Sequence, residues 1–208
     1  MNNLYEPISM QIERIVQETD DASLRSFELS FQKETDKQAF FKRYNPGQFC
    51  QLSIFGKGEA PFGIASAAWE GDFVRFTVQN VGSFTDTIHR SQVGDSIGMR
   101  GPLGNGFPIQ GWKGKDVVVI GGGCAFSTLY ALTKHIMHPD QRKKYGRIVV
   151  IYGARSSGLC LYKPDIKSWY QRPDMEIHQA VDVPEEGWNF HTGYVPDVVK
   201  DVAPSPKN

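Results

Sequence analysis

The segment Asp116–Thr128 constrains the fold of this chain more than any other stretch. Val117–Ile120 is a continuous apolar run, which is typical of a strand buried on both faces of a parallel sheet. The glycines Gly121, Gly122 and Gly123 follow directly, and a helical pattern comes after them. A strand, a glycine turn and a helix in this order aim backbone N–H groups and a helix N-terminus at a phosphate. The segment therefore predicts a nucleotide-binding βα unit, and a tight turn that binds no ligand is the alternative.

The helical pattern after the glycines rests on side chains that recur every three or four positions. They are Phe126, Leu129, Tyr130, Thr133 and Met137. Gly121 and Gly123 match the first half of the dinucleotide fingerprint G-x-G-x-x-G, but Phe126 stands at the third glycine. The fingerprint is therefore only partly present.

The composition excludes several classes of protein. Lysine plus arginine and aspartate plus glutamate each total 23, so the net charge is zero and no nucleic-acid partner is expected. The first residues lack a signal-peptide pattern, and no apolar run reaches the about 18 residues of a membrane span. Cys50, Cys124 and Cys160 form neither a disulfide framework nor a C-x-x-C pair. We expect a cytoplasmic protein without membrane insertion, and no metal or iron–sulfur cluster held by these residues.

Residues 1–112 are predicted to form a β-barrel or sandwich. Apolar and polar residues alternate in segments 26–31, 50–54 and 74–78, which is the pattern of strands with one buried face. Turn sequences rich in glycine, proline and asparagine separate these segments. A single short helix is expected in this half, near Thr85–Arg90.

Residues 113–208 are predicted to form an α/β unit, after a linker at Gly111–Gly114. The strand-like and helical segments alternate as Val117–Ile120, Phe126–His138, Ile148–Tyr152, Lys163–Tyr170 and Met175–Val181. This alternation implies a parallel sheet with right-handed crossovers.

Five short motifs, in order along the chain, resemble those of the ferredoxin–NADP reductase superfamily. They are Ala60–Ser66, Val81–Thr85, Gly101–Phe107, the glycine turn 121–123 and Tyr152–Ser156. The similarity is greatest to FAD-containing electron-transfer subunits of multi-subunit enzymes, such as those of sulfhydrogenase, anaerobic sulfite reductase and dihydroorotate dehydrogenase. The resemblance implies a Greek-key FAD-binding barrel followed by an NAD(P)-binding α/β domain.

The resemblance also implies which residues bind the cofactors. The residues expected at the isoalloxazine are Pro61, Phe62, Gly63 and Ile64, and those at the FAD pyrophosphate are Gly82, Ser83, Phe84 and Thr85. The residues expected at NAD(P)H are Gly121, Gly122, Gly123, Cys124, Arg155 and Ser156. Interpretations without a cofactor stay open: Phe62 as a core residue, Ser83 or Thr85 as a helix cap, and Arg155 as a solvated surface residue.

Four positions depart from the family pattern. Ala60 replaces the arginine that contacts the pyrophosphate, and Gly63 replaces the residue whose hydroxyl lies near flavin N5. Ala125 and Thr128 stand at the usual glycine and proline of the nucleotide loop. These departures affect the expectation of NAD(P)H binding more than that of FAD binding.

Two functions follow as hypotheses. The first is an FAD-dependent oxidoreductase subunit that passes electrons between NAD(P)H and an iron–sulfur or other redox partner in a hetero-oligomer. No protein side chain is expected to be catalytic in its own right, because the redox chemistry belongs to the cofactor. The second is a docking or flavin-binding subunit whose nucleotide site has degenerated.

The α/β unit is expected to be C-terminally incomplete. After the third strand the resemblance continues to a helix near Asp197–Val202, and the sequence then stops before the strand that would pair with Val117–Ile120. That strand would expose an apolar edge of unpaired N–H and C=O groups. We expect either a truncated sequence or an edge completed by a partner subunit, and truncation is favoured.

Overall fold

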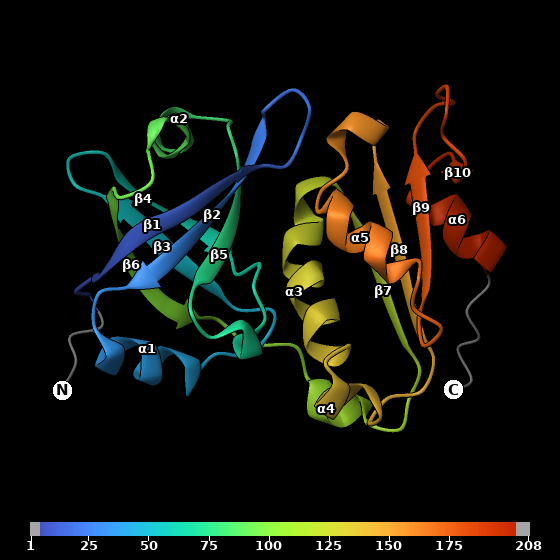
Figure 1. The fold of residues 1–208 in the computed structure, drawn as a ribbon, viewed down its shortest axis with the longest axis horizontal. Helices are drawn as coiled ribbons and strands as arrows, with labels where there is room; N and C mark the ends of the chain where they lie inside the picture. Colours follow the sequence, from blue (N-terminus) through green and yellow to red (C-terminus); the bar gives the residue numbers. More distant parts are fainter. Residues whose placement is uncertain (1–4, 203–208) are drawn as a thin grey trace.

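The computed structural model describes residues 5–202, which form two sheets that lie side by side (Figure 1). We call the first half the barrel and the second half the α/β unit. The barrel contains β1 (Ile8–Gln17), β2 (Leu24–Phe31), β3 (Phe49–Ile54), β4 (Gly58–Gly63), β5 (Val74–Gln79) and β6 (Ser96–Leu103). Its helices are α1 (Glu34–Phe41) and α2 (Ser83–Arg90), with short 3-10 turns η1 (Ala68–Glu70) and η2 (Ile109–Trp112).

The six barrel strands are antiparallel and run in the order β4-β3-β6-β1-β2-β5. An isolated bridge between Ile64 and Phe76 joins the end of β4 to β5, so the two edges of the sheet meet. Non-consecutive strands therefore lie side by side, as in a Greek key. The predicted barrel is confirmed, and its inside is filled by aliphatic and aromatic side chains from all six strands.

Two expectations for the barrel are wrong. The barrel has a second helix, α1, beyond the one expected near Thr85–Arg90. Helix α1 has no clear apolar pattern, because it is rich in charged residues and buries only Phe40, whose ring lies against those of Phe31 and Phe41. The alternation in β2 predicts one exposed face, yet Ser26 and Glu28 on that face are buried. The α/β unit covers this face, and no periodicity within β2 could show that.

The α/β unit is a parallel sheet between two layers of helix. Its strands are β7 (Val117–Gly122), β8 (Ile148–Ala154), β9 (Glu176–Val181) and β10 (His191–Thr192), in the order β10-β9-β8-β7. Its helical segments are η3 (Gly123–Ala125), α3 (Phe126–Ile136), α4 (Pro139–Arg142), η4 (Ser157–Leu159), α5 (Lys163–Trp169) and α6 (Val195–Val202). Helices α3 and α5 lie on the face toward the barrel, and α6 lies on the opposite face (Figure 1).

The strand β7 lies at the edge of the parallel sheet in residues 5–202. Val117 and Val119 pack against the core beneath α3, whereas Val118 and Ile120, on the other face, are 36% and 45% exposed. The expected apolar edge is therefore present in the part of the chain that the structure describes.

A buried polar network joins the barrel to the α/β unit. Ser26 and Thr77 are hydrogen-bonded on the outer face of the barrel, and the Thr77 oxygen lies 2.5 Å from the hydroxyl of Tyr162. Glu18 accepts hydrogen bonds from Ser26 and from the backbone N–H of Tyr162. Burial raises the pKa of Tyr162, which keeps the phenol neutral.

A second network starts from a charged pair across two barrel strands. Arg75 donates to Glu28 at 2.7 Å and to the hydroxyl of Tyr130 at 3.2 Å, and Tyr130 donates to Asp165 at 2.5 Å. The rings of Tyr130 and Tyr162 stack with their centroids 3.8 Å apart. Because these groups are buried and satisfied, they hold α3 and α5 in one orientation on the barrel.

Candidate functional site

In the glycine turn after β7, Gly121 and Gly123 are required for different reasons. At Gly121 a Cβ would lie 2.5 Å from a side-chain carbon of Leu129, so this glycine permits close packing of α3. At Gly123 the backbone φ is +52° and no protein atom lies within 4 Å of the place a Cβ would take. Gly123 therefore supplies a left-handed turn that faces open space, which suits the approach of a ligand.

The other expected nucleotide-binding residues emerge at the same edge of the sheet. Strands β7 and β8 are parallel, and Gly122, the last residue of β7, pairs with Gly153 in β8. The 3-10 turn η3 begins at the next residue, Gly123. Cys124 and Arg155 follow these strand ends and are exposed, and Ser156 is half-buried. The carboxyl edge of a parallel sheet is where such folds bind nucleotides.

A carboxylate that the sequence reasoning missed lies at this edge. Both carboxylate oxygens of Glu185, in the loop after β9, accept a hydrogen bond from the backbone N–H of Ser157 at 3.1 Å. Ser157 is the first residue of η4, directly after Ser156. The carboxylate of Glu185 thus places a negative charge beside Arg155 and Ser156, which follow β8. No local pattern in the sequence indicates that the loop after β8 contacts the loop after β9.

On the barrel, β4 ends at the expected isoalloxazine segment. The ring of Phe62 is half-buried and lies 6.2 Å from that of Phe84 at an interplanar angle of 24°. Pro61 is exposed and Gly63 is half-buried, whereas Ile64 is 0% exposed and closes the barrel through its bridge to Phe76. Ile64 therefore supports this segment from behind, and its side chain is not on the surface.

The start of α2 is shaped by Thr85. Its hydroxyl accepts hydrogen bonds from the backbone N–H groups of Val81 and Gly82 and donates to the carbonyl of Gly82. This reciprocal turn is half of a capping box, so the cap interpretation applies to Thr85. The hydroxyl of Thr85 is fully used within the turn and is not available to a phosphate.

These two segments fit the FAD that the resemblance implies. In the first turn of α2 the backbone N–H groups of Ser83 and Phe84 have no hydrogen-bond partner among residues 5–202, and no atom lies within 4 Å of a Cβ built on Gly82. A helix N-terminus with free donors favours an anionic pyrophosphate. The turn at Gly123 fits a dinucleotide because its backbone is left-handed and open on the side a Cβ would take.

The flavin segment and the nucleotide turn meet directly. The 3-10 turn η3 contacts both β5 and β8, and α2 contacts β4. A Cβ built on Gly63 would lie 2.3 Å from the Thr128 hydroxyl oxygen, in the first turn of α3. The two expected cofactor sites are therefore neighbours across the junction of the barrel and the α/β unit.

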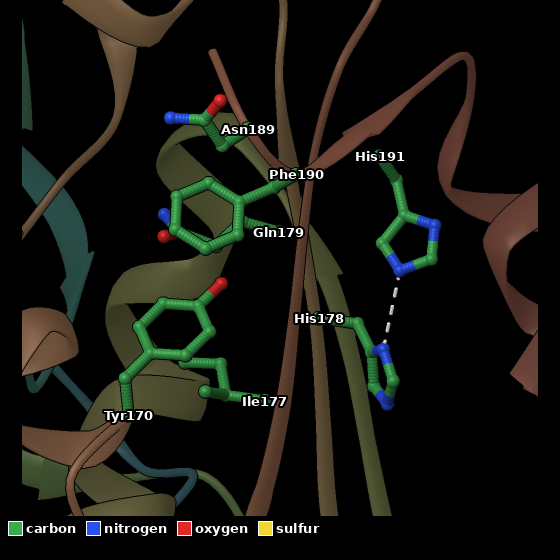
Figure 2. Close-up of a pocket in the computed structure, with 7 residues that line it drawn as sticks. All are labelled: Tyr170, Ile177, His178, Gln179, Asn189, Phe190 and His191. Carbon is green, nitrogen blue, oxygen red and sulfur yellow. Dashed lines mark hydrogen bonds between the residues drawn. The ribbon is translucent and has the colours of Figure 1, made fainter. Parts of the chain in front are cut away.

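Two cavities lie away from these segments. A cavity of about 420 Å³ lies beside β9 and β10, and Figure 2 shows Tyr170, Gln179 and Phe190 on one side of these strands and His178 and His191 on the other. A wider groove of about 990 Å³ runs between α1 and the ends of β1 and β6. None of the expected cofactor-binding residues lines either space. The expected cofactor sites are therefore defined by their N–H donors and glycines, and not by either of these two cavities.

Nothing in the described residues gathers three or more metal-ligating side chains. His178 Nδ1 and His191 Nε2 lie 3.2 Å apart, but they form a pair only. His138 accepts a hydrogen bond from the backbone N–H of Asp140, and no third metal-ligating side chain joins His135 and His138 among the described residues. None of the helices in residues 5–202 has the length and apolar character needed to cross a membrane.

Comparison with known proteins points to one family. Residues 119–208 match the family model described as "Oxidoreductase NAD-binding domain". Sulfhydrogenase 1 subunit gamma of Pyrococcus furiosus is 33% identical over 79% of this chain and 56% of that protein. A probable dihydroorotate dehydrogenase B (NAD(+)) electron transfer subunit of Methanothermobacter thermautotrophicus is 30% identical, over 78% of this chain and 54% of the length of that protein. The chain thus spans about half the length of these relatives.

Solved structures share the whole fold. A ferredoxin NADP+ reductase from Neisseria gonorrhoeae, solved with bound FAD and NADP, superposes with a TM-score of 0.74 at 18% identity, over 93% of this chain and 75% of that one. At this identity the likeness concerns the fold alone. Taken with the sequence relatives and the barrel–α/β architecture, these comparisons show that the chain belongs to the ferredoxin–NADP reductase-like FAD- and NAD-binding oxidoreductases, which include the sulfhydrogenase gamma and dihydroorotate dehydrogenase electron-transfer subunits.

Proposed function

We propose that this chain is an FAD-containing electron-transfer subunit that oxidises NAD(P)H and delivers electrons to an iron–sulfur or other redox partner. The observation that carries the proposal is the contact between Gly63, at the end of the flavin strand, and Thr128, just after the glycine turn. It brings the segment expected to hold the flavin ring beside the segment expected to hold the dinucleotide. Hydride transfer requires such closeness of the two rings.

Each part of the chain has one task in this proposal. Phe62 offers an aromatic face to the flavin ring, and the free N–H groups of Ser83 and Phe84 bind the FAD pyrophosphate. The turn at Gly123 and the start of α3 bind the dinucleotide phosphates, with Arg155 beside them. Bound FAD supplies the capacity to accept a hydride and release single electrons. The buried hydrogen-bond networks of Tyr130 and Tyr162 fix the orientation of the α/β unit relative to the barrel.

The proposal extends to partners and location. The named relatives are subunits of larger enzymes, and the exposed edge of β7 offers free backbone groups to a further strand. We propose a cytoplasmic hetero-oligomer in which a further strand pairs with the free edge of β7. Sedimentation of residues 1–208 alone tests this: aggregation or self-association is expected, and a monomer that oxidises NAD(P)H normally would contradict it.

The cofactor is tested by extraction and titration. We expect denatured protein to release FAD rather than FMN, and the bound flavin to bleach when NADH or NADPH is added without oxygen. A protein that holds FAD but is not reduced by either nucleotide would support the second candidate, a docking subunit with a degenerate nucleotide site, which Ala60, Ala125 and Thr128 favour. Release of FMN alone, or of no flavin, would contradict FAD binding.

A further inference from the structure

Thr128 fills the space that a side chain at Gly63 would take. The nearest atom to a Cβ built on Gly63 is the Thr128 hydroxyl oxygen at 2.3 Å, while Cβ and Cγ2 of Thr128 lie at 3.6 and 3.9 Å. The hydroxyl, and not the methyl group, is therefore the part of Thr128 that faces the end of β4. Any side chain at position 63 would displace it.

The hydroxyl of Thr128 is not used by the protein. A threonine within a helix commonly donates to the carbonyl one turn before it. Thr133 in the same helix does so, to Leu129 at 2.8 Å, and Thr87 in α2 donates to Ser83 at 2.9 Å. Thr128 has no hydrogen-bond partner among the residues that the structure describes, although it is half-buried. The Thr128 oxygen is not among the buried unpartnered polar atoms of the described residues, so this hydroxyl is reachable from outside the protein and free to bond a ligand.

Two departures from the family pattern meet in this contact. Gly63 lacks a side-chain hydroxyl and Thr128 provides one, although the positions are far apart in sequence and belong to different halves of the molecule. Either departure alone has no evident reason. Together they move one hydroxyl from the barrel strand to the first turn of α3 at the same point in space.

We propose that Thr128 is a cofactor-binding residue, whose hydroxyl forms the hydrogen bond to the isoalloxazine ring that Gly63 cannot form. The inference rests on the proposed function, since it takes FAD as the ligand beside Phe62. Its consequence is that part of the flavin site comes from the α/β unit. The position of this hydrogen bond then depends on the buried contacts that hold α3 on the barrel.

The test compares Thr128→Val, which removes the hydroxyl and keeps the shape, with Thr128→Ser, which keeps the hydroxyl. One net hydrogen bond corresponds to a change in binding of about 3- to 10-fold. We expect the dissociation constant for FAD to rise by that factor in Thr128→Val and to change less than about twofold in Thr128→Ser. The flavin absorption band and midpoint potential should shift in the valine variant only. The melting temperature of the flavin-free protein should be the same in both variants.

A reciprocal exchange provides the control. Gly63→Ser alone should weaken FAD binding, because the new side chain collides with Thr128. Gly63→Ser combined with Thr128→Ala should bind FAD more tightly than either single variant, because the hydroxyl has returned to the barrel. Two results would overturn this inference but not the proposed function. In the first, the dissociation constant for FAD, the flavin spectrum and the midpoint potential do not change in Thr128→Val. In the second, the double variant binds FAD no more tightly than Thr128→Ala. Wild-type protein that binds no FAD would overturn the proposed function, and with it any flavin role of Thr128.

Discussion

The hydroxyl groups of Tyr162 and Thr77 lie 2.5 Å apart, one from the α/β unit and the other from strand β5 of the barrel. Tyr162 precedes α5 with a backbone φ of +52°, an uncommon conformation for a residue with a side chain. The same residue stacks on Tyr130 and hydrogen-bonds Glu18 through its backbone. The orientation of the two halves therefore depends strongly on this one side chain.

We expect Tyr162→Phe to lower the free energy of unfolding by about 1–2 kcal/mol, because Thr77 and the network behind it lose a buried hydrogen bond. Urea denaturation measures the change. Tyr194→Phe is the matched control, since Tyr194 is 64% exposed and its loss of a hydroxyl should leave stability unchanged. Equal effects of the two substitutions would contradict a structural role of the Tyr162 hydroxyl.

Gly123→Val should raise the KM for NAD(P)H strongly or abolish reduction, while the flavin content stays normal. The new side chain would point into the open space beside the turn, where we expect the dinucleotide phosphates. The backbone φ of +52° adds strain of about 1–2 kcal/mol. Steady-state kinetics and flavin extraction measure the two effects.

Gly114→Val separates strain from ligand exclusion. Gly114 also has a positive φ, +78°, and open space around it, but it lies in the loop before β7, at the opposite end of that strand. A similar fall in stability with normal kinetics is expected. If Gly114→Val impaired reduction as much as Gly123→Val, the effect would come from strain and not from the nucleotide site.

The wild-type protein should prefer NADH to NADPH, and Glu185→Gln should reduce that preference. The Glu185 carboxylate accepts a hydrogen bond from the backbone N–H of Ser157, just after β8. Its negative charge would repel an adenosine 2′-phosphate bound there. We expect the dissociation constant for NADPH to fall about 10-fold, with that for NADH little changed, which corresponds to about 1.4 kcal/mol. Glu186→Gln, at the exposed neighbouring residue, is the control. A preference of the wild type for NADPH would contradict the prediction.

The free energy of unfolding should fall as the pH drops from 7 to 5, and mainly below 6.5. Burial, and then the proximity of His191, lower the pKa of His178 below its usual 6.5, so the folded protein keeps this ring neutral while the unfolded chain takes up a proton. His178→Asn should flatten this part of the profile of unfolding free energy against pH. His135 has a pKa lowered in the same direction, so part of the slope should remain.

A separate loss below about pH 4.5 should remain, somewhat smaller, in His178→Asn, because Arg147 is the main cause that lowers the pKa of Glu176 and the charge of His178 is a lesser one. It arises from Glu176, whose pKa is lowered by its hydrogen bond with Arg147 and which therefore stabilises the fold only when ionised. A slope between pH 7 and 5 that is identical in wild type and variant would show that His178 is not the group responsible.

Local patterns determined much of this protein from the sequence alone. The apolar run of β7, the glycine turn and the spacing of α3 depend on residues close together in the chain, so they are readable without the fold. The parallel order of β7, β8 and β9 follows from the alternation of strands and helices. Family motifs added the identity of the two halves, because they carry information about whole folds.

Only the tertiary structure decided which of these segments meet. Thr128 lies against Gly63, Glu185 accepts a hydrogen bond from Ser157, and Thr77 is hydrogen-bonded to Tyr162. Each pair joins different elements. The register of β2 and β5 places Glu28 opposite Arg75, yet only the packing of α3 turns that pair into an interface. Such contacts depend on how two finished units dock. Periodicity along one strand or helix describes a single face of that element and holds no information about the partner that covers it.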